Sequence, residues 1–363
     1  MIRHLHHIPD GLLDARADSL HRFLDGMTVI HLEGRRQPPI FISVLQHGNE
    51  DSGWEAVRRL LQRNPEGKLP RSVILLIANV EAARYGLRRL DHQPDFNRCW
   101  PGGPPAATAV HRALAELTDQ IRAVGPLLSL DIHNNSGRNP HYAAINRLDV
   151  PWLHLAQSFD RRAVYFQHPK GTQSDTFSHF CPAITLECGK AGTTNAVSHC
   201  LEFLERVLNW ESLPDEIELD PEFELFHTVA RTTVAPGVEF QFGAEAASIT
   251  FVEHLESLNF KRLEPDTVLG ELRESLPGIV HAITHDGVDV TGRYFKLDHA
   301  GRLVVANAFV PAMFSTDERV VRQDCLCYVM EPMELPRMRG VHQIQDGSAP
   351  ARVPARSVVT GIR

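Results

Sequence analysis

The strongest constraint on the fold is an alternation of short, unbroken apolar runs with amphipathic stretches between about residues 28 and 210. Continuous apolar runs of strand length are typical of strands buried on both faces of a sheet. They occur at 39–46, 72–80, 127–134, 141–146, 163–167 and 183–189. Helical spacing of apolar residues occurs at 51–64, 106–124 and 193–210. Strand and helix in alternation predict an α/β fold with a mostly parallel, mixed sheet sandwiched by helices.

The second half of the sequence has a different character. An acidic, proline-containing segment at 209–225 has the composition of a linker. Beyond it, short apolar runs separated by Gly, Pro and Asp predict a smaller β-rich domain. The end of the chain is rich in Arg, Pro, Gly and Ser, which predicts a loosely packed tail. We therefore predict an α/β domain at 1–212, a β-rich domain at 213–335 and a tail at 336–363.

Composition limits the classes of partner. The formal net charge of −8 argues against nucleic acid or an anionic membrane surface as the main partner, and leaves a local basic pocket for a small-molecule substrate open. The N-terminus lacks the apolar core of a signal peptide, and no apolar run approaches the ~20 residues that span a bilayer. The six cysteines form no CxxC pair and are expected to be reduced thiols. These features predict a cytoplasmic protein, and a homo-oligomer stays open.

Four polar insertions follow or end the apolar runs of the first domain. They are His47–Glu50, Asp95–Arg98, Asp131–Asn135 and Glu187. Ligands of open α/β sheets bind beyond the carboxyl ends of the strands, so these insertions are expected to converge. Any one of them alone is more often a solvated loop; the four together predict a site.

The residue types indicate a metal centre. Two histidines and one carboxylate are a common ligand set for catalytic zinc, and His47, Glu50 and His133 supply that set. Asp131 lies two residues before His133, and we expect it to orient a ligand imidazole, that of His47 being one candidate. Glu187 is a carboxylate within a buried run, where it needs either an ion-pair partner such as Lys190 or a catalytic role.

The segments HGNE, DFNR, DIHN and TLECG occur in this order and resemble the succinylglutamate desuccinylase/aspartoacylase family of zinc carboxypeptidase-like hydrolases. The resemblance covers about residues 40–200, and the β-rich half matches that architecture more loosely. It implies one zinc ion per chain, held by His47, Glu50 and His133. It further implies that Glu187 is the catalytic base, and that Asn97 and Arg98 bind the substrate carboxylate and help polarise the scissile carbonyl.

The remaining substrate contacts are less defined by sequence. Arg98 has an alternative partner in Asp95. The resemblance implies a further arginine upstream of Asn97 that contacts substrate; among the candidates we rank Arg89 first, ahead of Arg84, Arg88 and Arg138. The long polar loop after His133 predicts substrate contacts from Asn134 and Arg138. Tyr294 and Tyr328 are the candidates for a tyrosine that reaches the site from the second domain.

The leading functional hypothesis is a zinc-dependent amidohydrolase, a deacylase that cleaves the amide bond of an N-acyl amino acid or related small amide. A zinc metallocarboxypeptidase acting on peptides or cell-wall fragments is the alternative within enzymes. A binding or regulatory module that retains the zinc-site fold is the third.

Overall fold

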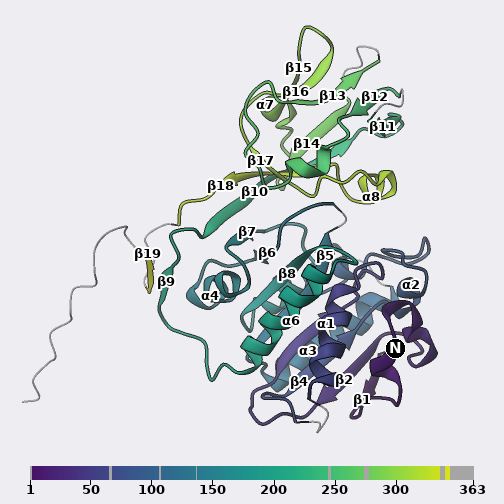
Figure 1. The fold of residues 1–363 in the computed structure, drawn as a ribbon, viewed down its shortest axis with the longest axis vertical. Helices are drawn as coiled ribbons and strands as arrows, with labels where there is room; N and C mark the ends of the chain where they lie inside the picture. The colour runs from purple at the N-terminus through teal and green to yellow at the C-terminus, as the bar shows by residue number, and fades with distance from the viewer. Residues whose placement is uncertain are drawn as a thin grey trace, which may run out of the picture.

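A twelve-stranded mixed sheet organises the chain (Figure 1). The computed structural model describes residues 2–64, 68–105, 108–135, 137–243, 247–273, 278–335 and 340–343. Eleven strands follow one path, in the spatial order β1 (Arg3–Leu5), β2 (Thr28–Leu32), β4 (Val73–Ile77), β3 (Ile40–Val44), β5 (Leu128–Asn135), β8 (Ala183–Lys190), β6 (Tyr142–Ile145), β7 (Arg162–Tyr165), β10 (Glu224–Val234), β18 (Cys327–Pro332) and β17 (Val310–Ala312). The twelfth, β14 (Val280–Thr284), pairs with β10.

The centre of this sheet is parallel, because β4, β3, β5 and β8 run in the same direction. Antiparallel neighbours flank it, β2 beside β4 and β6 beside β8. The prediction of a mostly parallel, mixed sheet is therefore confirmed. The parallel order also brings the carboxyl ends of β3, β5 and β8 to one edge, where the predicted polar insertions begin.

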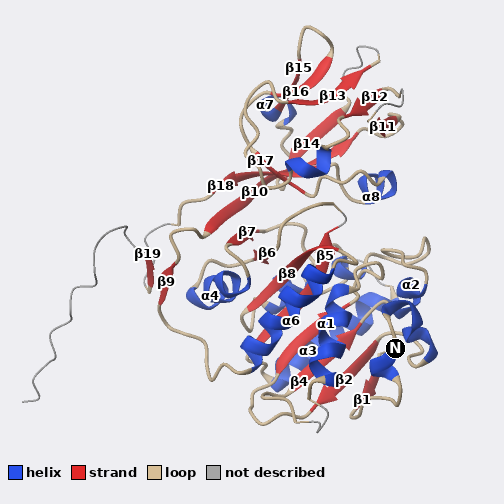
Figure 2. Ribbon diagram, viewed as in Figure 1, coloured by secondary structure: helices blue, strands red, loops and turns tan. Residues whose placement is uncertain are grey.

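Helices cover both faces of the sheet (Figure 2). The α-helices are α1 (Ser52–Gln62), α2 (Val80–Arg84), α3 (Ala109–Val124), α4 (Val150–Phe159), α5 (Gln173–Phe177), α6 (Thr194–Leu208), α7 (Thr291–Tyr294) and α8 (Glu318–Gln323). The described residues also form four 3-10 helices: η1 (Leu12–Asp14), η2 (Ala17–Arg22), η3 (Phe96–Arg98) and η4 (Leu255–Leu258).

Alternating side chains of β3 divide the core between the two faces. Ile40 and Ile42 belong to the cluster that includes α1, α4 and α6, whereas Phe41 packs with α3 and Phe177 on the other face. The strand is buried along its whole length, which explains its continuous apolar sequence. The sequence did not predict α4, because its buried residues leave it apolar on most sides and without a clear helical period.

The C-terminal half contributes to both sheets. A separate five-stranded sheet consists of β11 (Phe240–Phe242), β12 (Ile249–Phe251), β13 (Val268–Leu272), β16 (Arg302–Val305) and β15 (Phe295–Leu297). The long strand β10 instead pairs with β7, and so extends the large sheet into the second half of the chain (Figure 1). A boundary at 212/213 for independent folding stays a prediction.

The predicted tail lies largely outside the described residues. Positions 336–339 and 344–363 are not described, but β19 (Val341–Gln343) pairs in parallel with β9 (Ile217–Leu219). Within the described ranges, no helix combines the length and apolar character needed to cross a membrane.

A half-buried histidine pair near β6 predicts a pH effect on stability. The ring of His141 stacks on that of His199 in α6, with centroids 4.1 Å apart, and burial together with His199 lowers the pKa of His141 to about 4. The unfolded chain, with an ordinary His pKa near 6.5, therefore takes up this proton first as pH falls. This contribution to the free energy of unfolding is present above pH ~6.5 and is lost progressively toward pH ~4.

We expect His141→Gln to reduce the loss of melting temperature between pH 7 and pH 5, since glutamine keeps a partner for Asn195 but does not titrate. Thermal unfolding at both pH values measures this, with His299→Gln at an exposed site as the matched control. Equal losses in wild type and His141→Gln would contradict the assignment.

Candidate active site

The loop after β3 is shaped to hold His47 and Glu50 in place. Leu45 is buried and lies in the left-handed region, with φ of 57°, which turns the chain at the strand end. Gly48 lies against α2, and an added Cβ would come within 2.2 Å of the backbone nitrogen of Ala83. Only glycine therefore fits at position 48, and the side chains of His47 and Glu50 on either side of it face the end of β5.

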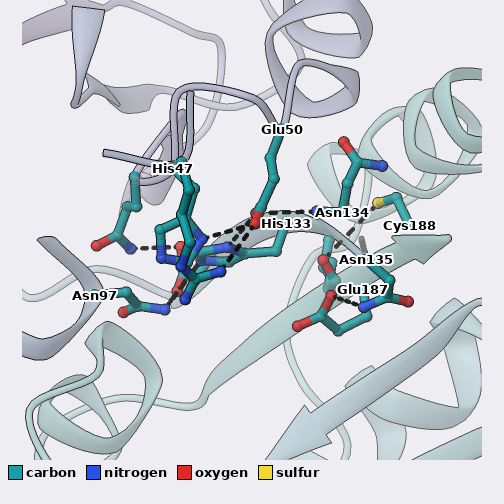
Figure 3. Close-up of polar contacts among 12 residues, drawn as sticks. His47, Glu50, Asn97, His133, Asn134, Asn135, Glu187 and Cys188 are labelled. Atoms are coloured by element: carbon teal, nitrogen blue, oxygen red, sulfur yellow. Dashed lines mark hydrogen bonds and ion pairs between the residues drawn. The ribbon is translucent and has the colours of Figure 1, made fainter. Parts of the chain in front are cut away.

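His47, Glu50 and His133 converge on one point (Figure 3). Nδ1 of His47 lies 2.8 Å from Oε1 of Glu50, and Nδ1 of His133 lies 2.7 Å from Oε2 of the same carboxylate. All three donor groups are buried and lie within 4.8 Å of one another. The adjacency of β3 and β5 produces this arrangement across 83 residues of sequence.

The second ring nitrogen of each histidine contacts a carboxylate other than that of Glu50. Nε2 of His47 lies 3.0 Å from Asp95, and Nε2 of His133 lies 2.9 Å from Asp131. Asp131 thus orients a ligand imidazole, but it is that of His133; the suggestion of His47 was wrong. Asp131 lies within the same strand as His133, whereas Asp95 arrives on the loop before η3.

The two asparagines near the metal donors are engaged within the protein. Asn97 donates from Nδ2 to Asp131 and accepts from the backbone nitrogen of Gln173, both at 3.1 Å. Asn134 accepts from the backbone nitrogen of Ser52 and donates to the carbonyl of Gly189. Both also line the cavity that contains Glu187, so the substrate contacts expected from the sequence stay a prediction.

Glu187 lies beside the metal donors on the next strand. It is in register with His133 across β5 and β8, and it accepts a hydrogen bond from Asn135 (Figure 3). Lys190, the suggested ion-pair partner, instead pairs with Glu256 at 3.2 Å. Burial raises the pKa of Glu187 to about 8; nearby Glu50 acts in the same direction and His133 opposes it. The carboxyl group can therefore gain or lose a proton near neutral pH.

Arginines approach the site from one side. Arg88 pairs with Asp95 at 3.0 Å and lies 3.5 Å from Glu50, so it takes the partner that the sequence offered to Arg98. Arg98 donates to the backbone carbonyl of Asn97, and no carboxylate of the described residues lies within ion-pair distance of it. Its guanidinium lines the cavity and is available to a ligand.

The other predicted basic residues lie elsewhere. Arg89 donates to the carbonyl of Gln93 and does not line the cavity beside Glu187, and Arg138 is exposed and lines neither cavity. Arg88, and not Arg89, is therefore the arginine before Asn97 that lies at the inner cavity. Neighbouring residues in a turn face different directions, which the sequence did not reveal.

Two connected cavities adjoin these side chains. The inner one, of about 90 Å³, contains His47, Glu50, His133 and Glu187 in its lining. The outer one is much larger, about 1360 Å³, and shares Arg88, Arg98, Thr228, Asp324 and Tyr328 with the first. The C-terminal half therefore supplies part of the site, which the sequence indicated only through Tyr328. Tyr294 is buried and donates to Glu331 at 2.6 Å, away from both cavities.

The donor set fits zinc. Zinc takes imidazole nitrogen and carboxylate oxygen, and catalytic sites leave a fourth position for water or substrate. Hydrogen bonds from the second ring nitrogen to a carboxylate or carbonyl fix the tautomer that leaves the ligand nitrogen free. Asp95 and Asp131 are placed to do this for His47 and His133.

Comparison with known proteins agrees with this site. Residues 36–209 match the family described as the succinylglutamate desuccinylase/aspartoacylase catalytic domain. None of the curated protein sequences matches the chain. Solved structures with a similar fold include the succinylglutamate desuccinylase from Chromobacterium violaceum, at 20% identity over 84% of this chain and 87% of that chain, with a TM-score of 0.54.

Murine aminoacylase 3 is similar at 16% identity over 82% of this chain and 97% of that chain, with a TM-score of 0.55. A product-bound structure of the ectoine utilization protein EutE (DoeB) from Ruegeria pomeroyi is similar at 14% identity over 85% and 88%, with a TM-score of 0.56. At these identities the structures show a shared fold. The family match is more specific, because residues 36–209, which contain all four polar insertions, are the ones that match the catalytic domain of the succinylglutamate desuccinylase/aspartoacylase family.

Proposed function

We propose that this chain is a zinc-dependent amidohydrolase that removes the acyl group from an N-acyl amino acid or a related small amide. One observation carries the proposal. One nitrogen of His47 and one of His133 lie beside the Glu50 carboxylate, and the other ring nitrogen of each histidine contacts a second carboxylate. Glu187 lies on the neighbouring strand, in register with His133. The family assignment of residues 36–209 supports it.

The residues divide the work as follows. His47, Glu50 and His133 hold the metal, which when bound supplies Lewis-acid polarisation of a carbonyl and activation of water. Glu187 accepts a proton from the attacking water and returns it to the departing amine. Asp95, Asp131 and Asn97 keep the donors oriented, because their own hydrogen bonds are made within the protein.

The substrate carboxylate is assigned to Arg98. A guanidinium presents a planar fork that matches a carboxylate, and this one has no competing ion pair among the described residues. Arg88 lies 3.5 Å from Glu50 and lines the inner cavity, which Arg89 does not. Arg88 is therefore a better candidate than Arg89 to stabilise negative charge on the carbonyl oxygen. Among the described residues, three further basic side chains line the outer cavity: Arg89, Lys170 and Arg231. They would draw an anion in spite of the chain's net charge of −8.

The size of the outer cavity keeps one alternative open. At about 1360 Å³ it has room for several residues of a peptide, as a metallocarboxypeptidase acting on peptides or cell-wall fragments would need. The same donors and the same base would serve that reaction, with Arg98 then holding the C-terminal carboxylate.

Release of free amine by the zinc-loaded chain tests the proposal across N-acyl amino acids, their carboxyl methyl esters and short peptides. We expect turnover of the acyl amino acids and a loss of kcat/KM on esterification. Arg98→Gln should raise KM about 10- to 100-fold for the free acids, the cost of losing a hydrogen bond to a charged group, with a smaller change in kcat. The same substitution should reduce the difference in kcat/KM between the free acid and its methyl ester.

Arg138→Gln is the matched control, since that side chain is exposed and lines neither cavity. Turnover of peptides alone would favour the carboxypeptidase. Bound zinc without hydrolysis of any compound in the panel would favour a binding module.

A further inference from the structure

The lining of the inner cavity has two chemically different parts. Arg88, Arg98 and Asp324 lie where it joins the outer cavity, because they line both. The apolar part of the lining that does not reach the outer cavity is here called the inner wall. The inner wall consists of Ala144, Val164, Phe166, Ala312, Met313 and Met330.

The inner wall is apolar and well packed. Val164, Ala312 and Met330 are almost fully buried and belong to one hydrophobic cluster, against which Ala144 and Met313 pack. It is formed by β6, β7, β17 and β18, so both halves of the chain contribute. Apart from His47 and His133, the basic residues in the lining of this cavity are Arg88 and Arg98, which also line the outer cavity.

The hydroxyl groups beside the inner wall are those of Tyr142, Thr172, Ser174 and Thr185. Thr185 donates to Ser174 at 2.9 Å, Thr172 accepts from the backbone nitrogen of Asp175 at the start of α5, and the hydroxyl of Tyr142 lies 3.7 Å from the sulfur of Met313. A ligand group placed against the inner wall would therefore meet mainly methyl, thioether and aromatic surface, with neutral hydroxyl groups at its border and no positive charge to receive a carboxylate.

Met313 has an unfavourable backbone conformation. Its backbone has φ of 70°, in the left-handed region that a side chain of this size rarely adopts. Its N–H donates to Asn139 at 3.0 Å, and its sulfur lies 3.6 Å from Nδ2 of Asn135, the residue that donates to Glu187. A backbone conformation that is unfavourable by itself persists where the surroundings fix it, and such positions concentrate at functional sites.

We propose that the inner wall is the acyl pocket and that it selects a short, uncharged, apolar acyl chain, with Met313 setting the length. This inference rests on the proposed function. If Arg98 binds the carboxylate of the amino acid, the amine half of the substrate lies toward the outer cavity. The acyl half then extends from the scissile carbonyl away from the outer cavity, toward the inner wall. A dicarboxylic acyl group such as succinyl would bring its second carboxylate against this apolar surface.

The first test is an acyl series on one amino acid: acetyl, butanoyl, hexanoyl, succinyl and glutaryl. We expect kcat/KM for butanoyl to exceed that for succinyl by about 100-fold or more, because the buried carboxylate lacks a partner. A preference for succinyl or glutaryl would overturn the proposal.

Two variants test the role of the wall in opposite directions. Met313→Ala should move the preference toward hexanoyl by about 10-fold, and Ala312→Val should move it toward acetyl by a similar factor, as expected when one or more methylenes gain or lose space. Met27→Ala, at a half-buried methionine outside both cavities, is the matched control. Unchanged acyl ratios in both inner-wall variants would refute the assignment.

Binding separates this inference from the proposed function. Calorimetry of the zinc-loaded wild-type chain with butanoate and with succinate requires no turnover. Absence of hydrolysis across the series would refute the deacylase function. Tighter binding of butanoate than of succinate would still support an apolar pocket, whereas tighter binding of succinate would refute it.

Discussion

Replacing Glu187 with glutamine is expected to lower kcat by about 10³-fold, within the usual range for loss of a general base, while the chain still binds one zinc ion. Glutamine has nearly the same shape and can still bond Asn135, but it cannot accept the proton of the attacking water. Because Glu187 is not one of the three converging donors, metal content should not change.

Steady-state kinetics on the best acyl amino acid, together with zinc content per chain, measure this expectation. Glu256→Gln is the matched control, since that carboxylate pairs with Lys190 and does not line the inner cavity. Full kcat in Glu187→Gln would exclude Glu187 as the base. A loss of zinc in the same variant would place it among the ligands.

The second large effect is expected from His133→Gln. The amide nitrogen of glutamine can take the place of Nε2 beside Asp131, but nothing replaces Nδ1 beside Glu50. If a binding free energy of about 10–16 kcal/mol is shared among three ligands, the loss of one removes roughly 3–5 kcal/mol, a factor of about 10² to 10⁴ in zinc affinity. Activity should fall with zinc occupancy.

Zinc content after dialysis against a competing chelator measures the affinity, and titration with zinc shows whether activity returns. His141→Gln makes the same substitution outside the site and should keep the metal. Treating the wild-type chain with the chelator should abolish turnover, and adding zinc should restore it. Full activity of the stripped wild-type chain would rule out a metal-dependent reaction.

The parts of the site that sequence predicted are those fixed by strand order. His47, Glu50, His133 and Glu187 follow or end apolar runs, and a parallel sheet brings such ends together whatever the length of chain between them. The convergence of these four side chains could therefore be predicted from the sequence. Asp131 was also found, because two residues along a strand keep a side chain on the same face.

The errors arose where loops or the partner of a side chain decide the outcome. Asp95 lies on an irregular segment, and nothing in its sequence indicates that it turns toward His47. Arg88 and Arg89 are adjacent and chemically equal, yet only Arg88 lines the inner cavity. The inner wall could not be anticipated either, because it requires knowing that β17 and β18 join the large sheet beyond β10.

The pairing of β7 with β10 also bears on how the chain is made. Until residues 224–227 leave the ribosome, β7 has no partner on that side. Unpaired strand edges invite association with other chains, and β7 is largely buried and apolar at its centre. The first 212 residues alone would keep this open edge, so the catalytic half is expected to need the C-terminal half for solubility as well as for its acyl pocket.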